Sequence, residues 1–272
     1  MTTNLPKDEV IAALAEELGA LADLLDDLPD AEWSTPTDLP GWDVHANVAH
    51  VIGTEAMLLG QSPPASDVEV ASLPHVRNDI AAMNEAWIVG LADVPPADMR
   101  DRLRTVTAER LAVLRAMGDD EWDEPGFTPA GRDTHGRFMR IRTFDCWMHE
   151  QDVRDAVGRP GHRSGAAVEQ ALDEMVTALG FVVGKRAGFP AGSSATFVLD
   201  GDPGRTVHVL VADRAGVVDA LDGPATVTLR AGVHSFTRVA GGRRPADAFD
   251  DVTVDGDPEL GARLLAHLAY TI

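Results

Sequence analysis

The stretch RIRTFDCWMHEQDVRDAVGRPG, residues 140–161, carries the pattern that decides the fold. Read as an α-helix, it places Arg142, Asp145, His149 and Asp152 at spacings of three, four and three residues. At about 3.6 residues per turn, this spacing puts the four ionisable side chains on one stripe of the helix. Most residues between them are bulky and apolar, which indicates a helix packed in a bundle with a polar site inside it.

The rest of the N-terminal half also has helical periodicity. Apolar residues recur every three or four positions, and Pro, Gly and Asp-rich segments separate the periodic stretches. Asp43 is the expected N-cap of one helix and Gly60 its expected end. The pattern predicts helices over 7–27, 43–60, 76–92, 96–118 and 136–157, with a loop at 119–136. These segments predict a bundle of at least four helices.

The pattern changes after GRPGHRSG, residues 158–165, which is the expected domain boundary. One more helix is predicted over 165–184. Period-2 or continuous apolar runs then predict strands within 194–201, 205–213, 225–232 and 251–256, with short helices at 234–242 and 258–272. The expected fold class is therefore a two-domain α+β protein. Residues 1–160 form a helix bundle, and residues 165–272 form a small α+β domain with a mostly antiparallel sheet.

Composition limits the function classes. Hydrophobic residues make up 44% of the 272 residues and charged residues 25%, as in ordinary soluble proteins with a core. The chain has no apolar run near 18 residues, and its acidic N-terminal segment is unlike a signal peptide, so a cytoplasmic protein without membrane spans is expected. The formal net charge of −21 argues against nucleic acids and anionic membranes as partners, and the expected partners are small molecules.

Cys146 is the single cysteine of the chain, so it cannot form an intramolecular disulfide. Zinc sites that need two or more thiolates are also excluded. We expect Cys146 to be a small buried core residue rather than a nucleophile. Any metal site is therefore expected to rely mainly on histidines and carboxylates.

Asp145 and His149 lie at positions i and i+4, so both can point at one metal ion. A catalytic zinc site usually has three protein ligands, and His50 is the best third candidate if its helix packs against helix 136–157. His45 lies about 140° away around the same helix and cannot readily share the ion. Two imidazoles and one carboxylate suit Zn²⁺, Ni²⁺ or Fe²⁺, and Asp152 is a candidate partner for an imidazole N–H. The residues alone leave a hydrogen-bonded core histidine and an exposed helix pair open as alternatives.

Two segments, LPGWDVHANVAHVIGTE (39–55) and TFDCWMHEQDVRDAVGRPG (143–161), resemble the mycothiol-dependent maleylpyruvate isomerase family, within the DinB-like metal-binding bundles. The C-terminal stretch from HSFTRVAGGRRPADAF to VTVDGDPELGARLLAHL is similar to that family's sterol-carrier-like second domain. The resemblance implies His50, Asp145 and His149 as metal ligands, although the isomerase proper has Glu in place of Asp145. It also implies that Arg243 binds a substrate carboxylate, with Arg238 and Arg244 left as neighbours of open role.

The same resemblance implies a function. The expected activity is that of a metal- and mycothiol-dependent thiol transferase or isomerase, in which a metal-activated thiolate attacks a small electrophilic substrate. The predominance of Arg over Lys fits a GC-rich actinobacterial source. A hydrolase that uses the same metal site and a non-catalytic protein that binds a small ligand or lipid are the alternatives. Arg142 is either a charge partner for a neighbouring carboxylate or a contact for an anionic ligand.

Overall fold

The structure, a computed structural model, describes residues 2–271, which divide into two compact units. The first unit is Met1–His162 and the second is Arg163–Ile272. Met1 and Ile272, the outer ends of the two expected domains, lie outside the described residues.

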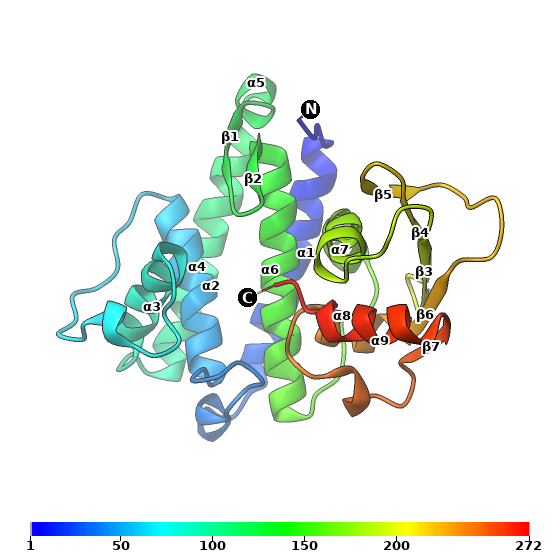
Figure 1. Cartoon of the computed structure of the whole chain (residues 1–272). Coiled ribbons are helices and arrows are strands. Elements are labelled where there is room, and N and C mark those ends of the chain that lie inside the picture. The colour runs from blue at the N-terminus through cyan, green and yellow to red at the C-terminus, as the bar shows by residue number, and fades with distance from the viewer. Residues whose placement is uncertain (1, 272) are drawn as a thin grey trace. The chain divides into compact units, whose positions relative to one another are not determined.

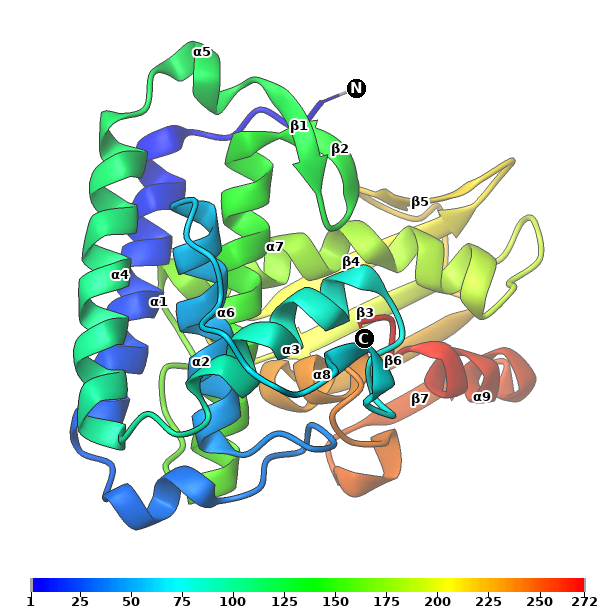
Figure 2. The same ribbon diagram turned by 90° about the vertical axis from the view of Figure 1, so that its left-hand side faces the viewer.

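The first unit is built around a four-helix bundle (Figures 1 and 2). Helix α1 packs against α4 and α6, helix α2 packs against the same two helices, and α3 lies on α2. The bounds are α1 Lys7–Asp26, α2 Val44–Leu58, α3 Asp79–Leu91, α4 Pro96–Ala116 and α6 His135–Val157. The predicted bundle is confirmed, and each helix agrees with its expected range to within about three residues at either end.

The ends of the two central helices have identifiable causes. The side chain of Asp43 accepts a hydrogen bond from the backbone N–H of Ala46 (2.9 Å) and caps α2, as its sequence position predicts. Thr134 caps α6 in the same way, by accepting from the N–H of Arg137 (3.1 Å). Gly158 ends α6 in the left-handed conformation, with φ of 65°.

Two expectations about irregular segments were wrong. The stretch expected as a loop at 119–136 forms a short helix, α5 (Asp119–Trp122), and an antiparallel hairpin of β1 (Pro125–Thr128) and β2 (Gly131–Thr134). An additional strand, β5 (Ala215–Val218), was not predicted. Each of these strands has four residues and lacks the apolar–polar alternation that marks the equally short β7 (Thr253–Gly256). Strand β5 is recognisable only from its pairing with β4 (Arg205–Val211).

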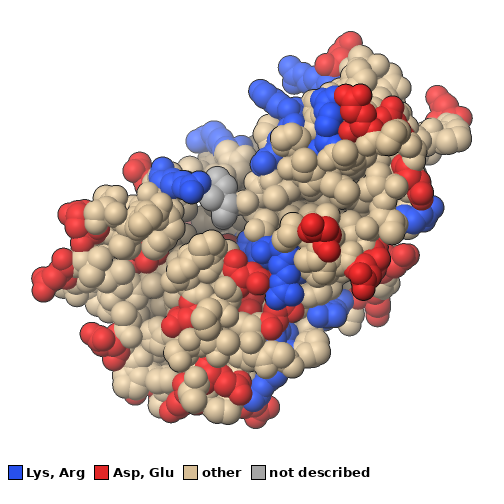
Figure 3. Space-filling view, turned by 60° about the horizontal axis from the view of Figure 1, so that its bottom comes forward, with Lys and Arg blue, Asp and Glu red and all other residues tan. Residues whose placement is uncertain are grey.

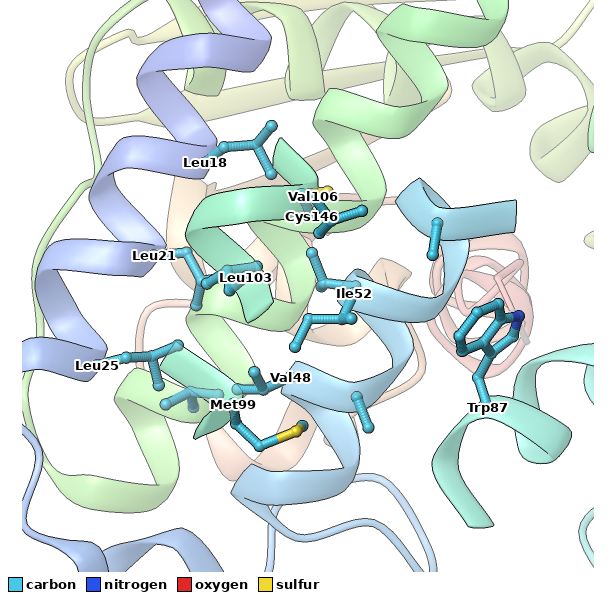
Figure 4. Packing of buried hydrophobic residues seen from close by; sticks show 14 of the residues in the cluster. Leu18, Leu21, Leu25, Val48, Ile52, Trp87, Met99, Leu103, Val106 and Cys146 are labelled. Atoms are coloured by element: carbon cyan, nitrogen blue, oxygen red, sulfur yellow. The ribbon is translucent and has the colours of Figure 1, made fainter. Parts of the chain in front are cut away.

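Leucines, valines and other apolar side chains from all four bundle helices form one core (Figure 4). Fully burying a side chain of this size stabilises the fold by about 1.5–3 kcal/mol. Cys146 is fully buried in this core, as predicted. Helix α3 approaches α2 closely at Gly53, where an added Cβ would lie 2.4 Å from the Trp87 ring, so this position requires glycine.

The second unit is a five-stranded sheet in the order β5–β4–β3–β6–β7, with helices packed against it. Only the β3–β6 pair is parallel in this sheet, so the prediction of a mostly antiparallel sheet is confirmed. The remaining bounds are α7 Ala166–Phe181, a π-helical turn Val182–Arg186, β3 Ser194–Asp200, β4 Arg205–Val211, β6 Val227–Gly232, α8 Val233–Ala240, β7 Thr253–Gly256 and α9 Pro258–His267.

The surface agrees with the acidic composition. On the face drawn in Figure 3, acidic side chains are interspersed with arginines and lysines and with uncharged surface, without a continuous basic area. Among residues 2–271, the structure contains no helix that is both long enough and apolar enough to cross a membrane.

Candidate metal centre

Helices α2 and α6 bring together the three residues that the sequence singles out. His50 lies on α2, and Asp145 and His149 lie one turn apart on α6, which packs against α2. His50 Nε2 is 3.0 Å from Asp145 Oδ2, and His149 Nε2 is 3.7 Å from Asp145 Oδ1. One donor atom from each residue lies within 4.8 Å of the others. We call these three residues the triad.

The triad is buried on its histidine side and open on its carboxylate side. The side chain of His50 is 5% exposed, whereas that of Asp145 is 31% exposed. The two imidazole rings lie 4.6 Å apart between centroids. Three protein donors with one accessible side match the arrangement of catalytic metal sites, which keep a coordination position open.

The orientation of His149 is set by Asn47, which the sequence reasoning missed. Asn47 Oδ1 lies 2.8 Å from His149 Nδ1, while Asn47 Nδ2 donates to the backbone carbonyl of Asp43 (2.9 Å). Because that second bond fixes the direction of the amide, Asn47 Oδ1 must accept from Nδ1–H, and Nε2 is the ring nitrogen of His149 that faces Asp145. The only signal in the sequence is an asparagine one turn before His50 in an apolar helical segment. The structure shows that this asparagine is buried.

Asp152 also lies beside His149, with Oδ2 3.3 Å from Nδ1. The sequence suggests Asp152 as an imidazole partner, and the structure places it there. His45 points elsewhere, since its Nε2 lies 2.9 Å from the carbonyl oxygen of Val94. The two histidines of α2 are therefore separated, as helical geometry predicts.

Arg142 connects the triad to a buried ion-pair network. Its Nη1 lies 2.5 Å from Asp145 Oδ2, and its Nε donates to Glu55 Oε1 (3.0 Å). Arg110 Nε lies 3.5 Å from the other oxygen of Glu55. Arg142 is thus the charge partner of two carboxylates, one of which, Glu55, was not predicted.

These contacts set the protonation states. Burial raises the pKa of Asp145, but the charge of Arg142 and the hydrogen bonds from the two imidazoles outweigh burial, so the net pKa is well below the usual value. Burial lowers the pKa of His50 to about 4, despite the opposing charge of Asp145. Burial also lowers the pKa of His149, but hydrogen bonds to Asp145 and Asp152 outweigh it and raise the net value. At neutral pH the triad therefore offers an ionised carboxylate and a neutral His50 imidazole.

Trp42, from the LPGW segment, lies against both imidazoles, at ring-centroid distances of 5.3 Å to His50 and 5.6 Å to His149. Its indole N–H donates to Glu85 Oε2 (3.3 Å) on α3. Trp42 also lines a cavity of about 560 Å³ with Leu39, His45 and other residues of α2 and α3 and their loops. A volume of this size suits a small organic ligand.

Arg243 lies in the second unit, just after α8, and its Nη1 donates to the carbonyl oxygen of Gly241 (2.8 Å). Arg238 is fully buried within α8, and Arg244 is exposed. The role that the resemblance implies for Arg243 therefore stays a prediction.

A helix bundle of the DinB type followed by a small α+β domain defines the class of this protein. Family models match both parts, the mycothiol maleylpyruvate isomerase N-terminal domain over residues 14–154 and the C-terminal domain of the same family over residues 169–263. The chain belongs to the mycothiol maleylpyruvate isomerase family, which is a family of thiol-dependent enzymes.

Solved structures agree with this fold. The crystal structures of the mycothiol-dependent maleylpyruvate isomerase and of one of its histidine-to-alanine mutants are each 21% identical to this chain, with TM-scores of 0.58 and 0.59. Each alignment covers 95% of this chain and 98% of the isomerase chain.

Two curated relatives, uncharacterized proteins from two strains of Mycobacterium tuberculosis, are each 26% identical to this chain over 151 residues. These residues are 54% of this chain and 56% of the relative, so the match spans about half the length of these relatives.

Proposed function

We propose that this protein is a metal-dependent isomerase or transferase that uses a low-molecular-weight thiol, with mycothiol as the expected thiol. The observation that carries the proposal is the convergence of His50, Asp145 and His149 on one point that is open to solvent on the Asp145 side. The family supports thiol-dependent chemistry. The substrate would be a small electrophile, such as an activated double bond.

The triad fits a divalent metal ion on its own chemistry. His149 presents Nε2 because Asn47 accepts from Nδ1–H, and burial keeps His50 neutral. Two imidazoles and one carboxylate suit Zn²⁺ first, and Ni²⁺ or Fe²⁺ as well. A divalent ion bound here would lower the pKa of a coordinated thiol, so that the thiol is a thiolate at neutral pH.

The surrounding residues have positioning roles in this proposal. Arg142 holds Asp145 ionised and fixes one of its oxygens, and Asn47 and Asp152 fix the ring of His149. The protein does not need a nucleophile of its own. Burial raises the pKa of the Cys146 thiol well above its usual value, which keeps this cysteine protonated and inert.

Arg243 is proposed to bind a carboxylate of the substrate, because a guanidinium can form two parallel hydrogen bonds with it. We expect Arg243→Lys to raise KM for an acidic substrate more than it lowers kcat. An unchanged KM would remove Arg243 from the binding site.

The metal proposal is tested by calorimetric titration of the metal-free protein with Zn²⁺. We expect tight binding by the wild-type chain and loss of that binding in His50→Ala and His149→Ala. His45→Ala is the matched control, since this residue lies on α2 but contacts Val94 instead of the triad. Undiminished binding in both triad variants would refute the metal site.

The reaction class is tested separately by assaying maleylpyruvate isomerisation with and without mycothiol. We expect the activity to require both metal and thiol. Turnover of an ester or amide substrate without any thiol would instead favour the hydrolase, which would use the same open side of the triad for a water molecule.

A further inference from the structure

A second group of metal-ligating side chains lies on another face of α6. Glu150 directly follows His149, so its side chain is rotated by about 100° around the helix, toward α1. There it meets Glu17 of α1 and His162, which lies in the segment after Gly158. His162 Nδ1 is 2.6 Å from Glu150 Oε2 and 3.4 Å from Glu17 Oε2. We call Glu17, Glu150 and His162 the closed cluster.

His162 is held in place by its backbone. Its carbonyl oxygen accepts a hydrogen bond from the indole N–H of Trp147 (3.0 Å), and Gln151 Nε2 donates to the neighbouring carbonyl of Gly161 (3.2 Å). The residue adopts a positive φ of 47°, which is uncommon outside glycine. Trp147 and Gln151 therefore fix a strained turn that aims the imidazole at two carboxylates.

Glu17 is the observation that points to a ligand. Its side chain is fully buried, and neither of its carboxylate oxygens accepts a hydrogen bond. An ionised carboxylate in this position costs several kcal/mol unless its charge is compensated. The compensating group for Glu17 is thus a proton, carried by Glu17 itself or by the His162 imidazole 3.4 Å away, or a bound cation.

The other members of the closed cluster are arranged as ligands. Arg154 Nε donates to Glu150 Oε1 (2.7 Å), which leaves Oε2 facing His162 and Glu17. On the other side of the imidazole, His162 Nε2 lies 3.5 Å from Glu16 Oε1. The 2.6 Å contact between Nδ1 and Glu150 Oε2 is a hydrogen bond that Nδ1–H donates in this structure. A cation would replace that proton. With Nε2–H toward Glu16, the lone pair of Nδ1 would then face the two carboxylates, as in metal sites whose histidine is oriented by an outer carboxylate.

We propose that Glu17, Glu150 and His162 form a second divalent-cation site, separate from the triad. One donor atom from each residue lies within 4.8 Å of the others. One imidazole with two carboxylates suits Zn²⁺, Mn²⁺, Co²⁺ or Fe²⁺. The ligands come from α1, from α6 and from the segment after α6, so a bound cation cross-links the beginning and the end of the first unit. With both carboxylates fully buried, this site is structural.

The first test uses the wild-type chain, so its result does not depend on whether a variant folds. Titration of the metal-free, full-length protein with Co²⁺, followed by visible absorption, is expected to give about two equivalents bound in two distinguishable steps. Saturation at about one equivalent, lost entirely in His50→Ala/His149→Ala, would overturn the second site and leave the proposed function standing.

Variants then show which residues are responsible for each Co²⁺ binding step. The double variant His50→Ala/His149→Ala is expected to retain about one equivalent of Co²⁺ and to melt at a higher temperature with Co²⁺ than without it. Adding Glu17→Gln or His162→Gln to this background should abolish both effects. Asp23→Asn, which changes an exposed carboxylate of α1 outside the closed cluster, is the matched control and should retain the bound equivalent. Retention after both Glu17→Gln and His162→Gln would mean that the cation binds elsewhere and would overturn the proposal.

The two proposals fail separately. Glu17→Gln alone is expected to keep about one equivalent, at the triad, and full Zn²⁺ affinity there. If the closed cluster of the wild-type chain binds no cation and is only a hydrogen-bonded network, the second site is refuted and the triad is not.

Discussion

The triad and the closed cluster are built on the same helix by consecutive residues, His149 and Glu150, but they differ in access. Asp145 of the triad is 31% exposed, whereas both carboxylates of the closed cluster are fully buried. Structural metal sites are closed and catalytic sites keep an open position. If both proposed sites bind a cation, the 100° step between adjacent helical residues lets one helix carry an open site on one face and a cross-link between chain segments on another.

Substitution of the arginine beside each site, Arg142 at the triad and Arg154 at the closed cluster, is expected to have the largest effect on stability. Arg142 is 4% exposed and is the partner of both Glu55 and Asp145, so Arg142→Met leaves the fully buried Glu55 and the partly exposed Asp145 without it. We expect a loss of about 3–5 kcal/mol in the free energy of unfolding. Arg154→Met should cost less, about 1–3 kcal/mol, because Glu150 keeps His162. Urea unfolding measures both. Equal losses in the free energy of unfolding would contradict the inference that Glu150 keeps a charge partner in His162 whereas Glu55 and Asp145 depend on Arg142.

Removing a ligand charge is the next largest change. Asp145→Asn keeps the shape of the side chain but removes the carboxylate that faces both imidazoles. Zn²⁺ affinity at the triad should fall by more than about 100-fold, because outer partners alone contribute about 10–100-fold. Competition with a chromophoric chelator measures the affinity. Glu150→Gln serves as the control, and an equal loss there would show that the two sites are not independent.

Loss of an orienting residue should have a smaller effect. Asn47→Ala removes the acceptor of His149 Nδ1–H without removing a ligand, so we expect a decrease in Zn²⁺ affinity of about 10–100-fold. The effect should be confined to the triad, since Asn47 has no counterpart in the closed cluster. Calorimetry on the variant checks this. An unchanged affinity would mean that Asp152 alone orients the ring.

Asp133, a carboxylate outside both sites, serves as the reference for how the free energy of unfolding depends on pH. Burial raises the pKa of Asp133, but hydrogen bonds from the N–H groups of Thr3 and Thr134 and from Arg137 outweigh it, so the net pKa is well below the usual value. A lowered folded-state pKa stabilises the protein above the unfolded pKa, near 4, and this stabilisation is lost as pH falls further.

We therefore expect Asp133→Asn to lower the free energy of unfolding by about 1 kcal/mol at pH 7. The difference from wild type should shrink as pH falls below about 4. Unfolding curves recorded across this pH range measure it. A difference that grows toward low pH would contradict the assignment.

Much of the fold could be predicted because local periodicity reflects local burial. The apolar spacing of α1 and α6 and the period-2 runs of β3, β4 and β6 are properties of single segments. The hairpin β1–β2 and strand β5 could not be predicted, since these short strands lack apolar–polar alternation and are defined by their pairing partners. The triad falls between these cases. Asp145 and His149 share a face by helical geometry, but His50 joins them only through the packing of α2 on α6.

The closed cluster marks the limit of sequence reasoning. Glu17 lies within the apolar pattern of α1, and nothing in its neighbourhood distinguishes it from a solvent-exposed glutamate. Its burial depends on α6 and on the turn that returns His162 to the bundle, 145 residues later in the chain. The sequence by itself determined the helices, the main strands and the spacing of Asp145 and His149, because these follow from backbone geometry. Only the tertiary structure decided which carboxylates and imidazoles meet, and which are open to solvent, because burial depends on residues distant in the chain.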